Sequence, residues 1–410
     1  MSQWTDYELH FPPVLVSEDQ RMIQQMVRDF VDKEIMPVRE QLEDSIELQN
    51  QIRQRLVDIG LQRMSMPKEY GGEGIRSTLL GAIISEELSR GDIGLAVSHM
   101  CTGWAWRPAI SGGMKAVLDE FMPNFCGDKV QIACFAMTEP GGAHGGGGCD
   151  IENYVYKGTK LRTTVSFQGD KCIINGTKMW ATNSGIADLY CIVGTIDPTL
   201  GEEGFVIAYI PDGTPGLTRG PNEDKCGLKS DHNCSLYFDD VEIPREWAIG
   251  PGGKAAELFW AQLPGVSSGA MATGIMQGVL ETILEYTGNR IVADRPIRQH
   301  GMPAEILADI AMNTEMARTW YLVTAYMCDH PEVYGPRTGF LAARMNMSRI
   351  TSEKAVRCAE RAIQLTGSYG YVRENHLEKY WRDSLMLTLW KGGTHLSRHN
   401  VCRGYYDLQI

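Results

Sequence analysis

The sequence predicts an α+β protein with an N-terminal helical domain, a middle β domain and a C-terminal helical bundle. Apolar residues recur at helical spacing through the first third of the chain. Short runs rich in β-branched and aromatic residues then alternate with turn residues. After that section the helical spacing returns and continues to the end. We therefore expect domains at residues 1–129, 130–250 and 251–410 of the 410-residue chain.

The N-terminal domain is expected to contain several helices, the first of which has a clear start. Ser17 and Gln20 have the spacing of a capping box, and apolar residues then follow at helical spacing. A second helix should pass through residues 48–57 and end at Gly60. Further helical patterns cover residues 79–88, 92–104 and 114–122.

The middle domain is expected to be a small antiparallel sandwich or barrel. Gly169-Asp170 and Asn175-Gly176 are turn dipeptides suited to hairpins between short strands. The expected strands cover residues 132–137, 171–174, 189–195, 204–210 and 235–238. In the C-terminal domain, a four-helix pattern covers residues 254–289, 302–329, 338–366 and 384–404.

Charge and composition exclude several classes of protein. The formal net charge of −12 argues against nucleic acid or an anionic membrane surface as a main partner. No apolar run reaches the length of a membrane span. The 11 cysteines contain no Cys-x-x-Cys pair and do not cluster with the nine histidines, so we expect no metal site. Because the first residues lack a signal-peptide pattern, we expect reduced thiols and a cytoplasmic protein.

A glycine- and aromatic-rich stretch near the C-terminus carries the strongest signal. Gln364 precedes the loop at residues 367–371, Arg382-Asp383 follows, and Lys391-Gly392 precedes the last helical pattern. This arrangement resembles the C-terminal signature of the FAD-dependent acyl-CoA dehydrogenases. That family carries Gln, a glycine-rich aromatic loop, Arg-Asp and then Glu-Gly. The resemblance covers residues 67–398 and implies the family's three-domain fold.

Two motifs in the middle domain resemble the flavin-binding motifs of the same family. One is a predicted strand that ends in Thr-Glu-Pro, and the other is the Asn-Gly-x-Lys-x-Trp-x-Thr-Asn run at residues 175–183. A tryptophan offers a flat face to an aromatic ring system, and a threonine offers a hydroxyl to its polar edge. By resemblance, the residues that would line the FAD ring are Phe135, Met137, Thr138, Trp180 and Thr182.

The resemblance also implies that FAD is shared between subunits of a homotetramer. In the family, an arginine at the position of Arg290 reaches the flavin diphosphate from a neighbouring subunit. Ala293-Asp294 stand here in place of the family's Phe-Gly, which is a departure at the adenosine site. The other cofactor-binding residues implied by the resemblance are Gln364, Gly367, Ser368, Gly393 and His395.

The expected substrate is an acyl-CoA thioester, and the expected electron acceptor is a protein such as an electron-transfer flavoprotein. The resemblance implies His144 and Arg398 as substrate-binding residues. The family's Gly-Ser-Asp is replaced here by Ala143-His144 and then a glycine run at residues 145–148. This run would be a mobile flap, a reshaped substrate mouth or a surface insertion without function.

The usual catalytic base of the family is missing. A carboxylate normally removes the proton α to the thioester, and this chain has Lys391 at that position. Some relatives place the carboxylate earlier, but the corresponding residues 263–266 contain none. The candidates are Lys391 itself and, on the helix that lines the acyl pocket in relatives, Asp92 and His99. A base on that helix suits a proton removed from γ or across a ring, as in oxidation of an unsaturated cyclic acyl-CoA.

Other interpretations of the missing base stay open at this point. The chain could need no base, as in a C–S or C–C lyase such as a desulfinase. It could be the non-catalytic subunit of a heterotetrameric acyl-CoA dehydrogenase. In a different class, it could be a CoA-binding scaffold protein without flavin. The intact motifs around Thr138 and Trp180 favour a flavoenzyme.

Overall fold

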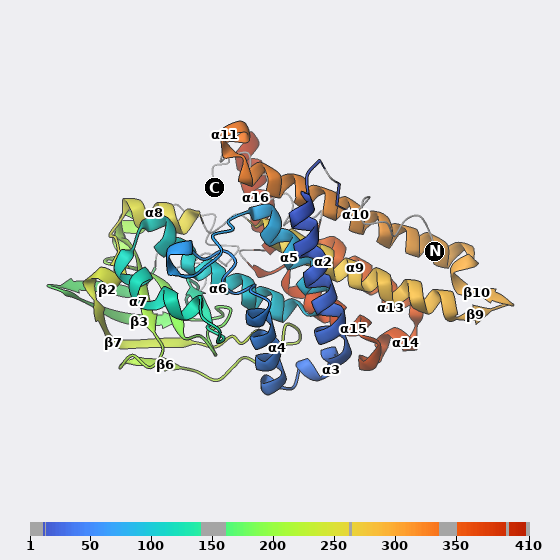
Figure 1. Ribbon diagram of the computed structural model, residues 1–410, viewed down its shortest axis with the longest axis horizontal. Coiled ribbons are helices and arrows are strands. Elements are labelled where there is room, and N and C mark those ends of the chain that lie inside the picture. The colour runs from blue at the N-terminus through green and yellow to red at the C-terminus, as the bar shows by residue number, and fades with distance from the viewer. Residues whose placement is uncertain are drawn as a thin grey trace.

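Helices, a sheet and further helices follow one another in the predicted order (Figure 1). The computed structural model describes residues 11–12, 14–140, 161–261, 265–335, 351–390 and 393–406. A curled sheet occupies one end of the molecule, and the long C-terminal helices extend toward the other end. This arrangement confirms the predicted α+β fold.

The N-terminal domain contains the predicted helices, and side chains cap most of their first turns. Ser17 accepts a hydrogen bond from the Gln20 backbone and Gln20 reaches back to Ser17, so the predicted capping box is confirmed. Ser45, Ser77 and Asp92 cap three later helices. The α-helices are α2 (Glu18–Phe30), α3 (Arg39–Leu42), α4 (Ile46–Asp58), α5 (Thr78–Gly91), α6 (Ile93–Gly112) and α7 (Lys115–Phe125).

The middle domain is a curled sheet in which most neighbouring strands are antiparallel. Its strands are β1 (Ala133–Ala136), β2 (Thr164–Gln168), β3 (Lys171–Lys178), β4 (Leu189–Thr195), β5 (Phe205–Pro211), β6 (Leu217–Arg219), β7 (Leu236–Pro244) and β8 (Ala248–Ile249). Their order is β6-β7-β3-β2-β4-β5-β8, with β1 paired to β4. The strands β1 and β2 run parallel to β4, in addition to the antiparallel pairs that the sequence predicts. Parallel pairing needs a long connection, and β2 and β3 lie in the chain between β1 and β4.

The two predicted hairpin turns have different outcomes. Gly169-Asp170 connects β2 to β3, with a φ of 62° at the glycine. Asn175-Gly176 lies inside β3 at a register shift, so its prediction as a hairpin turn is wrong. A Cβ atom at Gly176 would lie 2.6 Å from the Cα atom of Thr163. The glycine therefore permits a close approach of two strands rather than a chain reversal.

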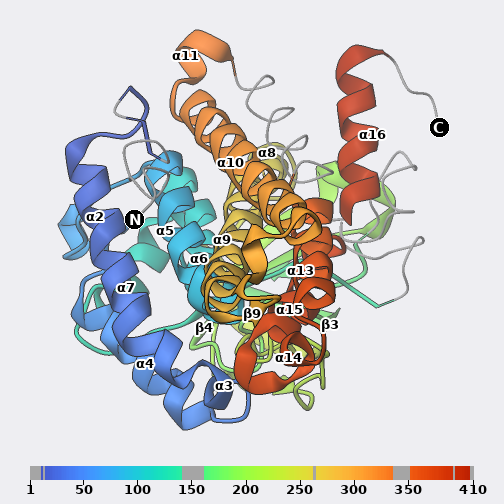
Figure 2. The same cartoon turned by 90° about the vertical axis from the view of Figure 1, so that its right-hand side faces the viewer.

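The C-terminal domain is organised around α9 (Val266–Asn289), which packs against α5, α10 and α13 (Figure 2). Its other helices are α8 (Gly253–Trp260), α10 (Gly301–Asp329), α11 (Pro331–Tyr334), α13 (Ser352–Thr366), α14 (Ser368–Tyr371), α15 (Leu377–Met386) and α16 (Gly393–Tyr405), and a small hairpin is formed by β9 (Ile291–Val292) and β10 (Arg295–Pro296). Short 3₁₀ or π segments cover Val31–Ile35, Met36–Val38, Lys68–Tyr70, Pro198–Gly204, Arg245–Trp247, Ile297–Gln299 and Arg373–Asn375.

Two of the predicted C-terminal helices are each divided in the structure. The pattern over residues 254–289 corresponds to α8 and α9, and the pattern over residues 384–404 to the end of α15 and to α16. Gly393 has a φ of 67°, which a continuous helix does not allow. Residues 338–350, the first part of another predicted helix, lie outside the described residues.

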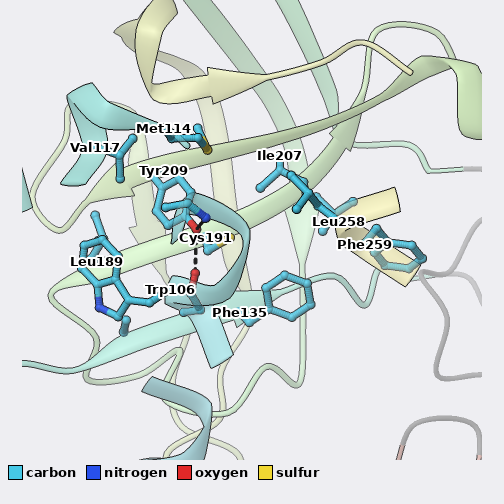
Figure 3. Packing of buried hydrophobic residues seen from close by; sticks show 14 of the residues in the cluster. Trp106, Met114, Val117, Phe135, Leu189, Cys191, Ile207, Tyr209, Leu258 and Phe259 are labelled. Atoms are coloured by element: carbon cyan, nitrogen blue, oxygen red, sulfur yellow. Dashed lines mark hydrogen bonds between the residues drawn. The ribbon is translucent and has the colours of Figure 1, made fainter. Parts of the chain in front are cut away.

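A buried aromatic cluster anchors α6 to the sheet (Figure 3). Trp106 on α6 is fully buried and stacks near Tyr209 of β5. The Tyr209 hydroxyl donates to the Ala105 carbonyl at 2.7 Å and accepts from the Ala109 backbone N–H at 3.0 Å. It thereby satisfies backbone groups beside Pro108, which lies inside the helix and has no N–H of its own. This anchor fixes the orientation of α6.

Candidate active site

The two predicted flavin-binding segments lie side by side at the ends of β1 and β3. The Met179 backbone N–H donates to the Thr138 carbonyl at 2.9 Å, which joins the Thr-Glu-Pro segment to the segment that carries Trp180. Phe135 and Met137 are buried, whereas Thr138 is half-buried. The structure therefore brings the strand residues predicted at the flavin ring close to Trp180.

Trp180 combines an exposed ring with an unusual backbone conformation. Its φ is 62° and its side chain is 45% exposed. Asn183 also has a positive φ, 70°, and its buried amide donates to the Ala133 carbonyl at 3.0 Å. Strained conformations of this kind persist where the surroundings hold them, and they cluster at ligand sites. A large aromatic face held open in this way is available to a planar ring.

Thr182 is oriented by Asp231, a residue that the sequence analysis did not identify. The Thr182 hydroxyl donates to the Asp231 carboxylate at 3.1 Å, and the Asn183 N–H donates to the other oxygen at 3.2 Å. The hydroxyl oxygen keeps its acceptor capacity for a ligand donor. Asp231 lies far along the chain in a loop before β7, so no local pattern connects it with the motif.

A buried ion pair holds the Thr138 turn against β3. Lys178 Nζ lies 2.6 Å from Glu139 Oε1 and donates to the Met137 carbonyl at 3.0 Å. The Glu139 carboxylate also accepts backbone N–H groups from Arg162 at 2.6 Å and Thr163 at 3.0 Å. Burial lowers the pKa of Lys178, and the Glu139 charge opposes that shift. The sequence analysis quoted both residues within motifs but missed their pairing.

A cavity of about 380 Å³ lies between α4, α5, α6 and the segment that precedes α5. Small residues make room for it: a Cβ atom at Gly81 would have no neighbour within 4 Å, and one at Gly103 would meet only Ser65 at 3.7 Å. His99 lines this cavity. Burial lowers the pKa of His99 to about 4, so its imidazole is neutral at neutral pH and can accept a proton.

Asp92, the other candidate on this helix, does not line the cavity. It is fully buried, caps α6 through a 2.9 Å bond from the Leu95 N–H, and lies 3.0 Å from Lys379 Nζ on α15. Burial alone would raise the pKa of Asp92, but Lys379 and hydrogen bonds that include one from Ser230 hold it at about 2. These contacts give Asp92 a structural role, so we do not propose it as the base.

The residues predicted at the ADP part of FAD lie far from the flavin-ring segments of the same chain. Arg290 and Gln364 are exposed; Arg290 directly follows α9 and Gln364 lies in the last turn of α13, and both helices extend away from the sheet (Figure 1). Gln364 accepts a hydrogen bond from Arg361 at 3.0 Å. Gly367, with a φ of 61°, ends α13 just before exposed Ser368. One chain alone does not join these residues to Trp180.

The remaining predicted residues lie at or near α16. Gly393 is buried and His395 exposed in its first turn. Arg398 forms an ion pair with Glu353 of α13 and donates to the Thr394 hydroxyl at 3.3 Å, so it connects two helices. His144 and Lys391 lie outside the described residues.

The helical–β–helical fold thus presents an open tryptophan beside a Thr-Glu-Pro strand, an arrangement suited to a planar cofactor such as a flavin. The models of the N-terminal, middle and C-terminal domains of acyl-CoA dehydrogenase match residues 17–128, 134–241 and 266–406. The chain belongs to the acyl-CoA dehydrogenase family and is an acyl-CoA dehydrogenase-like flavoenzyme.

Similar proteins cover nearly the whole chain. Cyclohex-1-ene-1-carbonyl-CoA dehydrogenase of Syntrophus aciditrophicus (strain SB) is 28% identical over 93% of this chain and 89% of its own length. The human short-chain specific acyl-CoA dehydrogenase is 29% identical over 96% of this chain and 92% of its own. Butyryl-CoA dehydrogenase from Megasphaera elsdenii has the same fold, with a TM-score of 0.84, 24% identity and coverage of 95% and 98%. A prolyl acyl carrier protein oxidase matches with a TM-score of 0.82, 26% identity and coverage of 95% and 99%.

The residues present fit FAD, the cofactor of this family. The exposed Trp180 ring, the Thr138 segment and the oriented Thr182 hydroxyl supply a flat face and polar groups for an isoalloxazine. Among the described residues, no group of three or more His, Cys, Asp or Glu is arranged to hold a metal ion. Within the same part of the chain, no helix is both long enough and apolar enough to cross a membrane.

Proposed function

We propose that the protein oxidises a CH–CH bond of a cyclic or unsaturated acyl-CoA, with His99 as the base. The position of His99 on the cavity wall carries this proposal. Among the described residues that line the cavity, the other ionisable side chains are arginines, which stay protonated. The imidazole of His99 is thus the ionisable group there that has an unprotonated nitrogen at neutral pH, because burial lowers its pKa and keeps the ring neutral.

The reaction needs one proton and one hydride to leave neighbouring or conjugated carbons while a C=C bond forms. Bound FAD would supply the hydride acceptor. His99 would take the proton on its neutral ring nitrogen, and Met100 and Trp104 on the same helix would keep water from the acyl group. A base on α6 instead of at position 391 suits a proton at γ or across a ring. The name of one relative, a cyclohex-1-ene-1-carbonyl-CoA dehydrogenase, supports a ring substrate.

The proposal extends to partners and place in the cell. We propose a homotetramer in which Arg290 and Gln364 reach the FAD of a neighbouring subunit, because one chain alone separates them from Trp180. Exposed apolar residues of the C-terminal domain support such an interface; they include Ile291, Met302, Met312 and Met316. An electron-transfer flavoprotein is the proposed acceptor. The cysteines among the described residues are free thiols, which is typical of proteins in the reducing cytoplasm.

The test follows flavin bleaching by an unsaturated alicyclic acyl-CoA under anaerobic conditions. His99→Gln keeps the size and polarity of the side chain but removes its basic nitrogen, and a general base is worth roughly 10²–10⁴-fold. We expect at least a tenfold slower reduction in this variant. His330→Gln, the same change at a half-exposed histidine that does not line the cavity, should reduce as fast as the unmodified protein. Equal rates for His99→Gln and His330→Gln would contradict the proposal and favour a base-free lyase or a non-catalytic subunit.

A further inference from the structure

The loop between β6 and β7 holds the segment that carries the predicted flavin-binding residues. The Asn233 side-chain amide donates to the Trp180 carbonyl at 3.1 Å. Next to this contact, the buried carboxylate of Asp231 accepts the Thr182 hydroxyl on one oxygen and the Asn183 backbone N–H on the other. The loop therefore fixes both the backbone of this segment and the hydroxyl that is expected at the polar edge of the flavin.

The chemistry of the two groups fixes the direction of the hydrogen bond between Thr182 and Asp231. An ionised carboxylate has no proton to give, so it can only accept hydrogen bonds. The Thr182 hydroxyl therefore directs its proton to Asp231 Oδ2, which lies 3.1 Å away. A hydroxyl has one proton and two lone pairs. What Thr182 can offer to a ligand is therefore a hydrogen-bond acceptor, not a donor.

Two cations are held beside Asp231 by the same loop. Arg53 of α4 donates to the Ser230 carbonyl at 2.7 Å, and the Lys225 amine donates to the Asp231 carbonyl. Burial lowers the pKa of Arg53 to about 10, and the charge of Asp231 is the largest effect that opposes this shift. Burial also lowers the pKa of Lys225, again with the charge of Asp231 as the largest opposing effect. Positive neighbours favour the ionised form of a carboxylate, as the direction of the hydrogen bond requires.

We propose that Asp231 is a positioning residue that holds the Thr182 hydroxyl as a hydrogen-bond acceptor toward FAD, so that the protein favours the reduced over the oxidised cofactor. Reduced flavin carries a ring N–H group at a nitrogen that has only a lone pair in oxidised flavin. A hydroxyl that can only accept gains a hydrogen bond with the first form and faces a lone pair in the second. The inference depends neither on His99 nor on the acyl group, so it stands or fails independently of the proposed function.

Replacing Asp231 by asparagine reverses the polarity of Thr182 with little change in shape. The Asn183 backbone N–H can only donate, so the amide that replaces the carboxylate must turn its oxygen there and its NH₂ group toward Thr182. The hydroxyl then accepts from the amide, and its proton is left for the ligand. The substitution also removes a negative charge, which by itself favours the reduced flavin because reduction adds electrons. The two effects have opposite signs, and removing the Thr182 hydroxyl separates them.

The experiment measures the reduction potential of bound FAD by anaerobic titration with an indicator dye, without any substrate. Thr182→Val should lower the potential, because the reduced form loses its acceptor, whereas Thr182→Ser should keep it. Asp231→Asn is made alone and together with Thr182→Val. Its effect alone should be more negative by at least about tenfold in the preference for reduced FAD, or about 30 mV. Asp188→Asn is the control, since Asp188 also accepts a backbone N–H, from Ile132 at 2.7 Å, and it should leave the potential unchanged.

Three results would overturn the inference. A higher or unchanged potential in Thr182→Val would mean that the hydroxyl does not accept from reduced FAD. A fall in Thr182→Ser as large as in Thr182→Val would assign the effect to the methyl group. Equal shifts from Asp231→Asn with and without the Thr182 hydroxyl would leave Asp231 only a charge or a structural support. If Asp231→Asn does not fold, the direction of the Thr182→Val shift still decides whether the hydroxyl accepts.

Discussion

Replacing Lys178 by methionine would leave Glu139 buried without its counter-charge. Both side chains are at most 1% exposed, and their charged atoms lie 2.6 Å apart. Breaking a buried pair by removing one partner typically destabilises a protein by about 3–5 kcal/mol. Glu139 would keep its two backbone donors, from Arg162 and Thr163, so we expect a loss near the lower end, ~3 kcal/mol. The Met137 carbonyl would also lose a donor beside the flavin site.

The assay is urea unfolding of Lys178→Met followed by tryptophan fluorescence, together with the FAD content of the purified variant. Lys171→Met is the matched control because Lys171 lies on the same strand in a half-exposed pair with Glu242. Exposed pairs contribute roughly 0–1 kcal/mol, so this control should unfold almost like the unmodified protein. Adding Glu139→Gln to Lys178→Met should restore part of the loss, since it removes the stranded charge. If Lys178→Met is as stable as Lys171→Met, the ion pair does not hold the Thr138 turn.

Three further predictions concern pH, Asp92 and Lys391. Burial, with a smaller effect of nearby cations, lowers the pKa of His232 from 6.5 to about 4. Below neutral pH, His232 therefore binds a proton in the unfolded chain but not in the folded protein. Stability should therefore fall by ~2 kcal/mol from this group between pH 7 and 5, and His232→Gln should flatten that dependence in urea titrations. Asp92→Asn should cost about 1.5–3 kcal/mol in the same titrations, because Lys379 loses one charged partner but keeps Asp383 at 2.7 Å, and it should leave flavin reduction by the folded protein unchanged. Lys391→Glu, which restores the family's base, should raise dye-coupled activity on straight-chain acyl-CoAs by roughly 10²–10⁴-fold; no gain would mean that the cavity, not the base, excludes them.

The sequence correctly predicted features that depend only on interactions between residues close together in the chain. The capping box at Ser17 and the Gly169-Asp170 turn are confirmed because each needs only neighbouring residues. Asn175-Gly176 was predicted as a hairpin, and it is a bulge because Thr163 of another segment passes close to the glycine. A dipeptide alone does not distinguish these two uses of glycine.

The candidate site was predicted only in the parts that depend on residues close together in the chain. The two motifs were each recognised from neighbouring residues, and the structure joins them through the hydrogen bond from the Met179 N–H to the Thr138 carbonyl, where β1 and β3 end. Asp92 precedes a helical pattern, a position typical of an N-cap, and this signal could have argued against a catalytic role. Its ion pair with Lys379 joins α6 to α15 and could not be read from sequence, because the two residues lie far apart in the chain.

The measurement that tests the central claim most directly is an anaerobic single-turnover experiment on the FAD-loaded protein. Saturated, unsaturated and alicyclic acyl-CoA thioesters are mixed with it while flavin absorbance is followed and products are identified by mass. We predict that at least one unsaturated alicyclic thioester bleaches the flavin and is recovered with two hydrogens fewer. A protein that binds FAD but is bleached by none of these thioesters would contradict the claim that it is an acyl-CoA-oxidising enzyme.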